Sequence, residues 1–204
     1  MTSASDPRLE KVELFFSYRS PYSYLAAPRA FELEDRYAIT LDVRGVIPMI
    51  MRGQSVPREK GLHTLRDAKR EADALGMPFG PMFDPVGDGA MRCLAVGELA
   101  KDEGRQKEFV LRASSAIWSQ GVEVASDEGL REVVESAGLG WQAAQAAIAD
   151  DRLKARVEAN VAALEAREHW GVPTFVFRDE LFWGQDRIVD LEVRLREAGL
   201  ELSR

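Results

Sequence analysis

The spacing of apolar residues changes its period near both ends of the chain, and this change restricts the available folds. Residues 12–16 are a short apolar run rich in strand formers, and residues 40–43 are a second such run. The pattern between them predicts a helix over residues 21–36. Because a strand, a crossover helix and a second strand place the two strands in parallel, the opening predicts a parallel β-α-β unit.

The C-terminal end returns to short strands. Residues 174–177 and 181–183 are aromatic runs on either side of a polar turn, which predicts a β-hairpin. Gly184-Gln185-Asp186 then offers a carboxylate cap to a final helix. The apolar stripe of that helix consists of Ile188, Leu191 and Leu195.

The long region between these ends has an almost wholly helical pattern, punctuated by glycine and proline. We expect helices over residues 58–75, 88–102, 105–119, 127–137, 140–149 and 151–168. The last of them carries a stripe predicted to enter the core, made of Leu153, Val157, Val161 and Leu164. The resulting prediction is one α/β domain formed by residues 1–50 and 171–204, with residues 51–170 as an inserted helical domain.

Composition narrows the classes of function. The chain has 204 residues, of which 46% are hydrophobic and 30% charged, and its formal net charge is -7. This acidic balance argues against nucleic acid or an anionic membrane as the main partner. No run approaches the ~18 apolar residues of a membrane span, and the N-terminus lacks the apolar stretch of a secretory signal. We therefore expect a soluble cytoplasmic protein.

A single cysteine, Cys93, excludes an internal disulfide, a Cys-x-x-Cys redox cycle and a cysteine-rich zinc site. The two histidines, His63 and His169, do not have metal-ligand spacing, so no metal site is expected. Cys93 lies in an apolar helical stretch, where a free cysteine usually behaves as a small hydrophobic residue. We predict that it is buried and not a nucleophile.

Ser20 and Pro21 form the start signal of the first helix. Serine is a preferred helix cap, and proline is well suited to the first helical turn. Unpaired amides at such a helix start carry about half a positive charge, which favours a thiolate over a thiol. Pro28, farther along, is predicted to kink or break the helix, because proline has no N–H to donate.

These features together resemble the DsbA-like branch of the thioredoxin fold. Thioredoxins place Cys-x-x-Cys at a helix start after a strand, with a proline five residues beyond the second cysteine. Here Ser20-Pro21-Tyr22-Ser23 occupies the first position and Pro28 falls at that spacing. Val172-Pro173 resembles the residue and cis-proline that face the active-site helix. The resemblance implies a thioredoxin-like α/β fold with a large all-helical insertion.

With serines at the two cysteine positions of this motif, the chain is similar to 2-hydroxychromene-2-carboxylate isomerases and kappa-class glutathione transferases. The motifs that carry this resemblance are Ser20-Pro21-Tyr22-Ser23-Tyr24-Leu25, Lys60-Gly61, Ala90-Met91-Arg92, Gly171-Val172-Pro173 and Gly184-Gln185-Asp186-Arg187. It implies a homodimeric, glutathione-dependent isomerase acting on a small conjugated aromatic substrate without net redox change. Ser17 and His63 depart from the family pattern, so the glutathione site is specified more closely than the substrate pocket.

The resemblance also assigns roles to individual residues. Ser20 is the catalytic residue, and it would stabilise the thiolate of glutathione rather than act as a nucleophile. The residues implied for glutathione binding are Lys60, Val172, Pro173, Gln185 and Asp186. Those implied for the substrate are Tyr22, Arg92 and Trp118.

Simpler roles compete with several of these assignments. Ser20 and Asp186 are also ordinary helix caps. Lys60 in a charged segment is also typical of a solvated surface. Arg92 either binds a substrate carboxylate or pairs with a structural acid, and only a position facing Ser20 would favour the first. Trp118 is an aromatic of the kind that more often fills a core.

Two other functions use the same features. A kappa-like glutathione transferase would share the site but keep the thioether product. A redox-inactive binding protein with a thioredoxin fold would instead recognise a peptide through the Val172-Pro173 edge.

Overall fold

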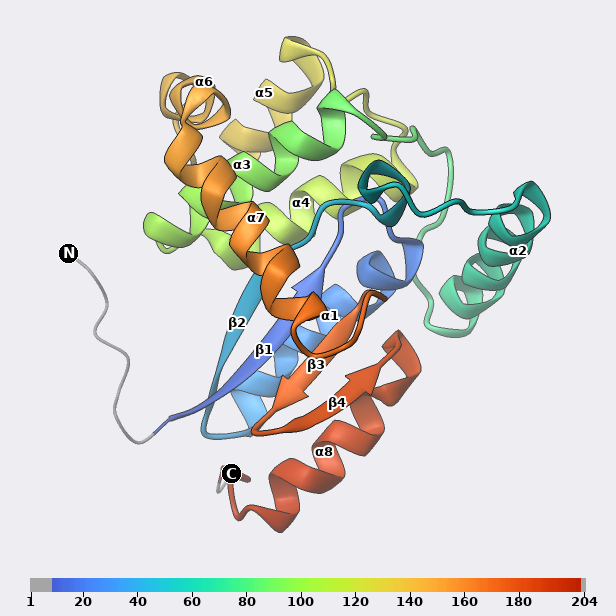
Figure 1. The fold of residues 1–204 in the computed structure, drawn as a ribbon, viewed down its shortest axis with the longest axis vertical. Helices are drawn as coiled ribbons and strands as arrows, with labels where there is room; N and C mark the ends of the chain where they lie inside the picture. The colour runs from blue at the N-terminus through green and yellow to red at the C-terminus, as the bar shows by residue number, and fades with distance from the viewer. Residues whose placement is uncertain (1–8, 203–204) are drawn as a thin grey trace.

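The computed structural model describes residues 9–202, which form one four-stranded sheet surrounded by helices (Figure 1). Strand β1 (Glu10–Phe16) runs parallel to β2 (Ile39–Gly45), and α1 (Pro21–Arg36) connects them. This confirms the predicted β-α-β opening. Both strands are longer than predicted because their polar ends, Glu10-Lys11 and Arg44-Gly45, still pair across the ladder.

The C-terminal strands complete the sheet in the order β2-β1-β3-β4. Strand β3 (Thr174–Phe177) is antiparallel to β1, and β4 (Glu180–Trp183) is antiparallel to β3. A short 3-10 turn, η2 (Gln185–Arg187), then leads into α8 (Ile188–Glu197). The predicted hairpin and final helix are therefore confirmed. The predicted carboxylate cap is wrong, because Asp186 lies within η2 and its side chain caps neither η2 nor α8.

The helical region follows β2 and contains six helices and one 3-10 turn. Its elements are η1 (Met49–Arg52), α2 (Arg58–Ala74), α3 (Asp88–Asp102), α4 (Gln106–Ser119), α5 (Asp127–Ser136), α6 (Trp141–Ala149) and α7 (Asp151–Glu165). The sequence did not predict η1. The prediction for the last helix was also too long: α7 ends at Glu165, and Glu168 has a φ of 54°, which reverses the chain.

Alternation along the strands assigns the helices to the two faces of the sheet. Val12, Leu14 and Phe16 of β1 face one side, in the hydrophobic cluster that includes the buried residues of α1 and α8. Phe15 faces the other side, where it packs in a second cluster with Leu164 of α7 and Val176 of β3. The predicted stripe of α7 thus enters the core.

Helix α1 continues through Pro28 without a break. Its N-terminal half is largely buried and includes Ser23, Leu25 and Ala26. Burial of this apolar face stabilises the helix and outweighs the loss of one hydrogen bond at proline. Of the two expected effects of Pro28, the break is therefore wrong, and the kink stays a prediction.

The main hydrophobic cluster contains residues of the sheet, of α1 and α8, and of α3 to α7. For example, the Tyr18 ring packs edge-on against Phe109 of α4 with the ring centroids 5.9 Å apart. Helix α2 contributes least, because only Ala68 and Ala72 of its residues are buried; it packs against α1 at the periphery of the molecule (Figure 1). The division into two domains stays a prediction.

Cys93 lies on α3 with no exposed surface, as predicted. Burial raises the pKa of its thiol to about 12, so the thiol stays protonated at neutral pH. Between residues 9 and 202, no helix is long and apolar enough to cross a membrane. The same residues contain no group of three or more potential metal-ligating side chains.

Candidate active site

Ser20 lies between the start of α1 and the segment that precedes β3. Its Oγ accepts a hydrogen bond from the Ser23 amide at 3.2 Å, so it is the N-cap of α1. The same hydroxyl donates to the carbonyl oxygen of Val172 at 3.3 Å. The first turn of α1 carries no acidic residue. Ser20 therefore combines a capping role with a position at an electropositive helix end that faces Val172.

The Val172-Pro173 peptide bond is cis. The Val172 carbonyl faces Ser20, while its amide N–H has no hydrogen-bond partner among the described residues. The Pro173 carbonyl accepts from the Gly184 amide at 3.0 Å, which joins this segment to the turn before α8. The Val172 N–H is thus a free backbone donor beside the start of α1. Such a donor suits pairing with the backbone of an extended peptide.

Gln185 and Asp186 follow Gly184 but lie in different environments. Gln185 is buried, and its Nε2 donates to Glu71 of α2 at 2.8 Å. Arg29 of α1 donates from Nη2 to the Gln185 backbone carbonyl at 3.1 Å and also to its Oε1. Asp186 is exposed and pairs with Arg187 at 2.8 Å. The Gln185 side chain therefore joins α1 to α2, and Asp186 remains accessible to a ligand.

Replacing Gln185 with Ala is expected to destabilise the fold by about 1–3 kcal/mol, because it removes the side-chain acceptor of Arg29 and the side-chain donor to Glu71, both of which are half-buried. Burial already lowers the pKa of the Arg29 guanidinium, which shows the cost of desolvating it. Urea denaturation measures the change. Gln120→Ala is the matched control, since the exposed Gln120 side chain donates to Ser115 and makes no other hydrogen bond within residues 9–202. Equal unfolding free energies for the two variants would contradict this structural role of Gln185.

Lys60 lies in the first turn of α2 and is exposed. Its Nζ lies 5.6 Å from the ring centroid of Trp170, within the range of a cation–π contact. Trp170 precedes Gly171 and Val172 directly in the chain. The structure therefore places Lys60 near the segment that carries Val172.

Tyr22, in the first turn of α1, donates its hydroxyl to Asp67 of α2 at 2.6 Å. Burial, together with this hydrogen bond and the Asp67 charge, raises the pKa of the Tyr22 phenol well above its ordinary value. The phenol therefore stays neutral and donates to Asp67. Tyr22 lies beside Ser20 in the chain, but its polar atom is committed to α2.

Trp118 is a core residue. Only 6% of its surface is exposed, and its Nε1 donates to the Tyr18 carbonyl at 2.9 Å. The indole stacks on Phe79 with the ring centroids 5.8 Å apart. These contacts favour the structural interpretation of Trp118 over a wall of an open pocket.

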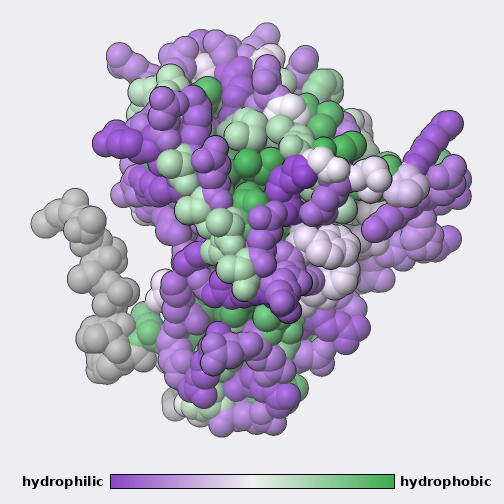
Figure 2. Space-filling view, in the orientation of Figure 1, coloured by the Kyte–Doolittle hydropathy of each residue, from purple (hydrophilic) through white to green (hydrophobic). Residues whose placement is uncertain are grey.

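Arg92 pairs with Asp127 and donates to the Ala125 carbonyl. Of the two roles considered for Arg92, these contacts favour pairing with a structural acid. Arg92 also lines a cavity of about 490 Å³ between α3, α5, α6 and α7. The lining residues are Asp88, Met91, Arg92, Ala95, Asp127, Gln145, Ile148 and Lys154, and Ser20 is not among them. Figure 2 shows hydrophobic residues at the surface of this face, over α3 and η1.

The structure thus brings Ser20, Val172 and Pro173 together, and the Gly184–Pro173 hydrogen bond attaches the Gln185-Asp186 turn to them. Lys60 lies near this group because it contacts Trp170, which precedes Gly171 and Val172. Arg92 and Trp118 have partners elsewhere.

Three further residues support the site and were missed from sequence, namely Arg29, Glu71 and Trp170. No local pattern identifies them, because their partners are distant in the chain; Arg29 and Gln185 are 156 positions apart.

A strand, a capped helix start and a cis-proline segment at one edge of a mixed sheet define a thioredoxin-fold protein, here with serine at the helix start. A family model described as a DSBA-like thioredoxin domain matches residues 11–196. The chain therefore belongs to the DsbA-like thioredoxin family, which confirms the fold expected from the resemblance.

Curated relatives of the chain carry one name. This chain is 26% identical over 191 residues to 2-hydroxychromene-2-carboxylate isomerase of Pseudomonas putida, and the match covers 89% of this chain and 92% of that protein. It is 27% identical over 197 residues to the protein of the same name from Sphingobium xenophagum, covering 89% and 95%. The family resemblance seen in the motifs is thus confirmed over most of the chain.

Solved structures show the same fold. A 2-hydroxychromene-2-carboxylate isomerase structure matches with a TM-score of 0.77 at 23% identity, covering 92% of this chain and 95% of that one. The cytosolic disulfide reductase DsbM of Pseudomonas aeruginosa, solved with GSH, matches with a TM-score of 0.65 at 23% identity, covering 91% and 99%.

Proposed function

We propose that this protein is a glutathione-dependent isomerase of the 2-hydroxychromene-2-carboxylate isomerase type. The observation that carries the proposal is the Ser20 hydroxyl, which lies between the start of α1 and the Val172 carbonyl where redox members of the fold have cysteine. The names of the relatives that match most of the chain support the reaction class.

The polar groups at this edge fit the chemistry of glutathione. The helix start and Ser20 suit a thiolate, and the free Val172 amide suits the backbone of the cysteinyl residue. The start of η2 offers amides to the γ-glutamyl carboxylate, and the exposed Asp186 suits the adjacent ammonium group. Lys60 suits the glycyl carboxylate. Each charged part of the ligand thus has either an oppositely charged partner or backbone N–H donors.

When bound, glutathione would supply the thiolate that adds reversibly to a conjugated substrate. Ser20 has one hydroxyl proton, which would turn from the Val172 carbonyl to the charged sulfur and favour it, and the α1 amides contribute positive potential. Val172 orients the cysteinyl backbone, and Asp186 and Lys60 hold the two ends of the tripeptide. Because Ser20 and Ser23 replace the redox pair and Cys93 is buried, the site performs no disulfide exchange.

Tyr22 is the substrate contact best supported by position, since it lies in the same helical turn as Ser20. Arg92 and Trp118 would need to give up the contacts described above to reach a substrate at Ser20. The homodimer and the cytoplasmic location stay predictions, and light scattering of the purified protein measures the first.

The test is to follow 2-hydroxychromene-2-carboxylate by absorbance and by mass spectrometry, with and without glutathione. We expect conversion to an isomer of equal mass only when glutathione is present, with glutathione recovered unchanged. Accumulation of a stable conjugate would favour the kappa-like transferase instead. Tight peptide binding without affinity for glutathione would favour the redox-inactive binding protein.

A further inference from the structure

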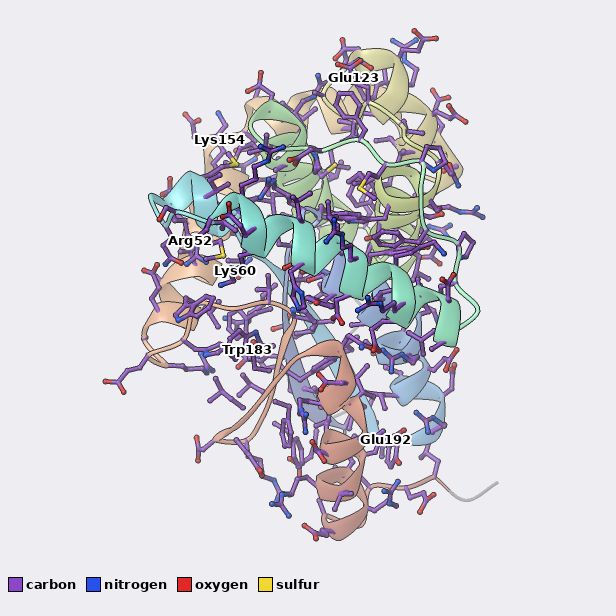
Figure 3. All side chains as sticks on the ribbon, turned by 90° about the vertical axis from the view of Figure 1, so that its right-hand side faces the viewer. Arg52, Lys60, Glu123, Lys154, Trp183 and Glu192 are labelled. Carbon is purple, nitrogen blue, oxygen red and sulfur yellow. The ribbon has the colours of Figure 1, made fainter. Side chains whose placement is uncertain are left out.

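Three aromatic rings lie beside Val172 on the side that carries Lys60. The Trp170 and Trp183 rings meet edge to face with the centroids 5.1 Å apart, and the His169 ring packs edge-on against Trp183 at 5.0 Å. The two tryptophans are 38% and 51% exposed, which is unusual for such large apolar side chains. Figure 3 shows Arg52, Lys60 and Trp183 along the same side of the molecule.

Gly171 permits this arrangement. A Cβ at Gly171 would overlap Nε1 and Cε2 of the Trp183 indole, so the absence of a side chain lets the ring lie directly on the backbone before Val172. Trp183 is the last residue of β4 and pairs with Thr174 of β3. The ring cluster is thus attached to the sheet and to the Val172 segment at once.

Arg52 holds the backbone of Trp170 in place. Its Nη2 donates to the Trp170 carbonyl at 3.0 Å, while its Nε donates to the Ile47 carbonyl at 3.0 Å. Its Nη1 pairs with Glu165 at the end of α7 at 3.1 Å. The Arg52 side chain is only 9% exposed, so these three contacts fix the position from which the Trp170 ring projects.

Lys60 depends on that ring for its position. Within residues 9–202, the Lys60 ammonium forms no ion pair and no side-chain hydrogen bond, and its contact with Trp170 is a cation–π interaction at 5.6 Å. A free lysine side chain samples many rotamers, so without the ring the ammonium would spread over a wide volume. Burial lowers the pKa of His169, so this neighbour stays neutral and does not repel the ammonium.

We propose that Trp170 is a positioning residue that holds the Lys60 ammonium beside the Val172 edge. When a thiol peptide lies along this edge, its free C-terminal carboxylate pairs with the Lys60 ammonium, which the Trp170 ring already holds in position. The site therefore discriminates between a peptide with a free C-terminal carboxylate and one whose carboxylate is blocked. This inference rests on the proposed function, because it takes glutathione as the peptide.

The experiment measures, by calorimetry, the dissociation constants of glutathione and of its glycyl ethyl ester. Trp170→Leu is expected to weaken glutathione binding roughly two- to five-fold, the range for an exposed cation–π contact. Ester binding should not change. Trp170→Phe should restore much of the preference for the free acid. In Lys60→Met, the added Trp170→Leu change should have no further effect.

Trp141→Leu is the matched control, because Trp141 also lies against a cation, the Arg131 guanidinium at 5.2 Å, but on α6. Equal weakening by Trp141→Leu, or equal weakening toward acid and ester in Trp170→Leu, would overturn the inference. Wild-type protein that binds glutathione but not in preference to the ester would overturn it too. Wild-type protein that binds no glutathione would overturn the proposed function and this inference together, which separates the two failures.

Discussion

Ser20→Ala is expected to lower kcat roughly ten- to a hundred-fold while glutathione still binds. The change removes one hydrogen bond to a charged sulfur, worth about 1.5–3 kcal/mol, and this loss falls on the reacting thiolate. Val172, Asp186 and Lys60 lie at other parts of the proposed site and keep their groups. Turnover of 2-hydroxychromene-2-carboxylate at saturating glutathione, with calorimetry for affinity, measures both quantities.

Ser20 also caps α1, so its loss affects stability, and a control must separate the two effects. Ser126 is the N-cap of α5, and its Oγ accepts from the Gly129 amide at 3.1 Å. Each substitution by Ala removes one cap and should cost about 1 kcal/mol of unfolding free energy. Ser126→Ala should therefore match Ser20→Ala in stability and keep wild-type turnover. Equal loss of turnover in both variants would assign Ser20 a structural role alone.

The same substitution has an expected pH signature. A hydroxyl that donates to the thiolate stabilises its charged form and lowers the pKa of the bound thiol. Removing the donor raises that pKa, so the rising limb of the pH–rate profile should move to higher pH in Ser20→Ala. Ultraviolet titration of the bound thiolate gives the pKa directly. Identical titration curves for wild type and variant would show that Ser20 does not contact the sulfur.

The parts of the fold that the sequence predicted are those with local causes. Ser20 and Pro21 have side-chain chemistry that starts a helix, and the structure has α1 beginning at Pro21. The strands at residues 12–16 and 174–177 follow from apolar runs of strand formers. The predicted break at Pro28 is wrong because the local cost of proline was considered without the burial of the α1 face around it.

The residues that the sequence could not place have partners far along the chain. Arg92 had two open alternatives, and its pairing with Asp127 of α5 appears only when α3 and α5 are packed together. Gln185 was assigned to glutathione binding by the resemblance, and the contacts that join it to α1 and α2 have partners far along the chain that no local pattern indicates. The cis state of Val172-Pro173 is likewise set by tertiary context, since most X-Pro bonds in folded proteins are trans.

Asp186→Asn is expected to raise the dissociation constant of glutathione about ten-fold with little change in kcat. In the proposed site the carboxylate meets the γ-glutamyl ammonium, and a charge-assisted hydrogen bond contributes about 1.5–3 kcal/mol. Asp186 is exposed, so solvent screening favours the lower end of that range, which corresponds to roughly ten-fold in affinity. The reacting sulfur lies at Ser20, so saturation with glutathione should recover turnover.

Asp190→Asn provides the matched control. Arg187 pairs with Asp190 at 3.1 Å as well as with Asp186, so both variants remove one exposed ion pair from the same guanidinium. Neither should change stability much, because exposed pairs contribute little. Cysteinylglycine, which lacks the γ-glutamyl group, should bind wild type and Asp186→Asn equally. If Asp190→Asn weakens glutathione binding as much as Asp186→Asn, or if cysteinylglycine binding falls in step, the ammonium contact at Asp186 is contradicted.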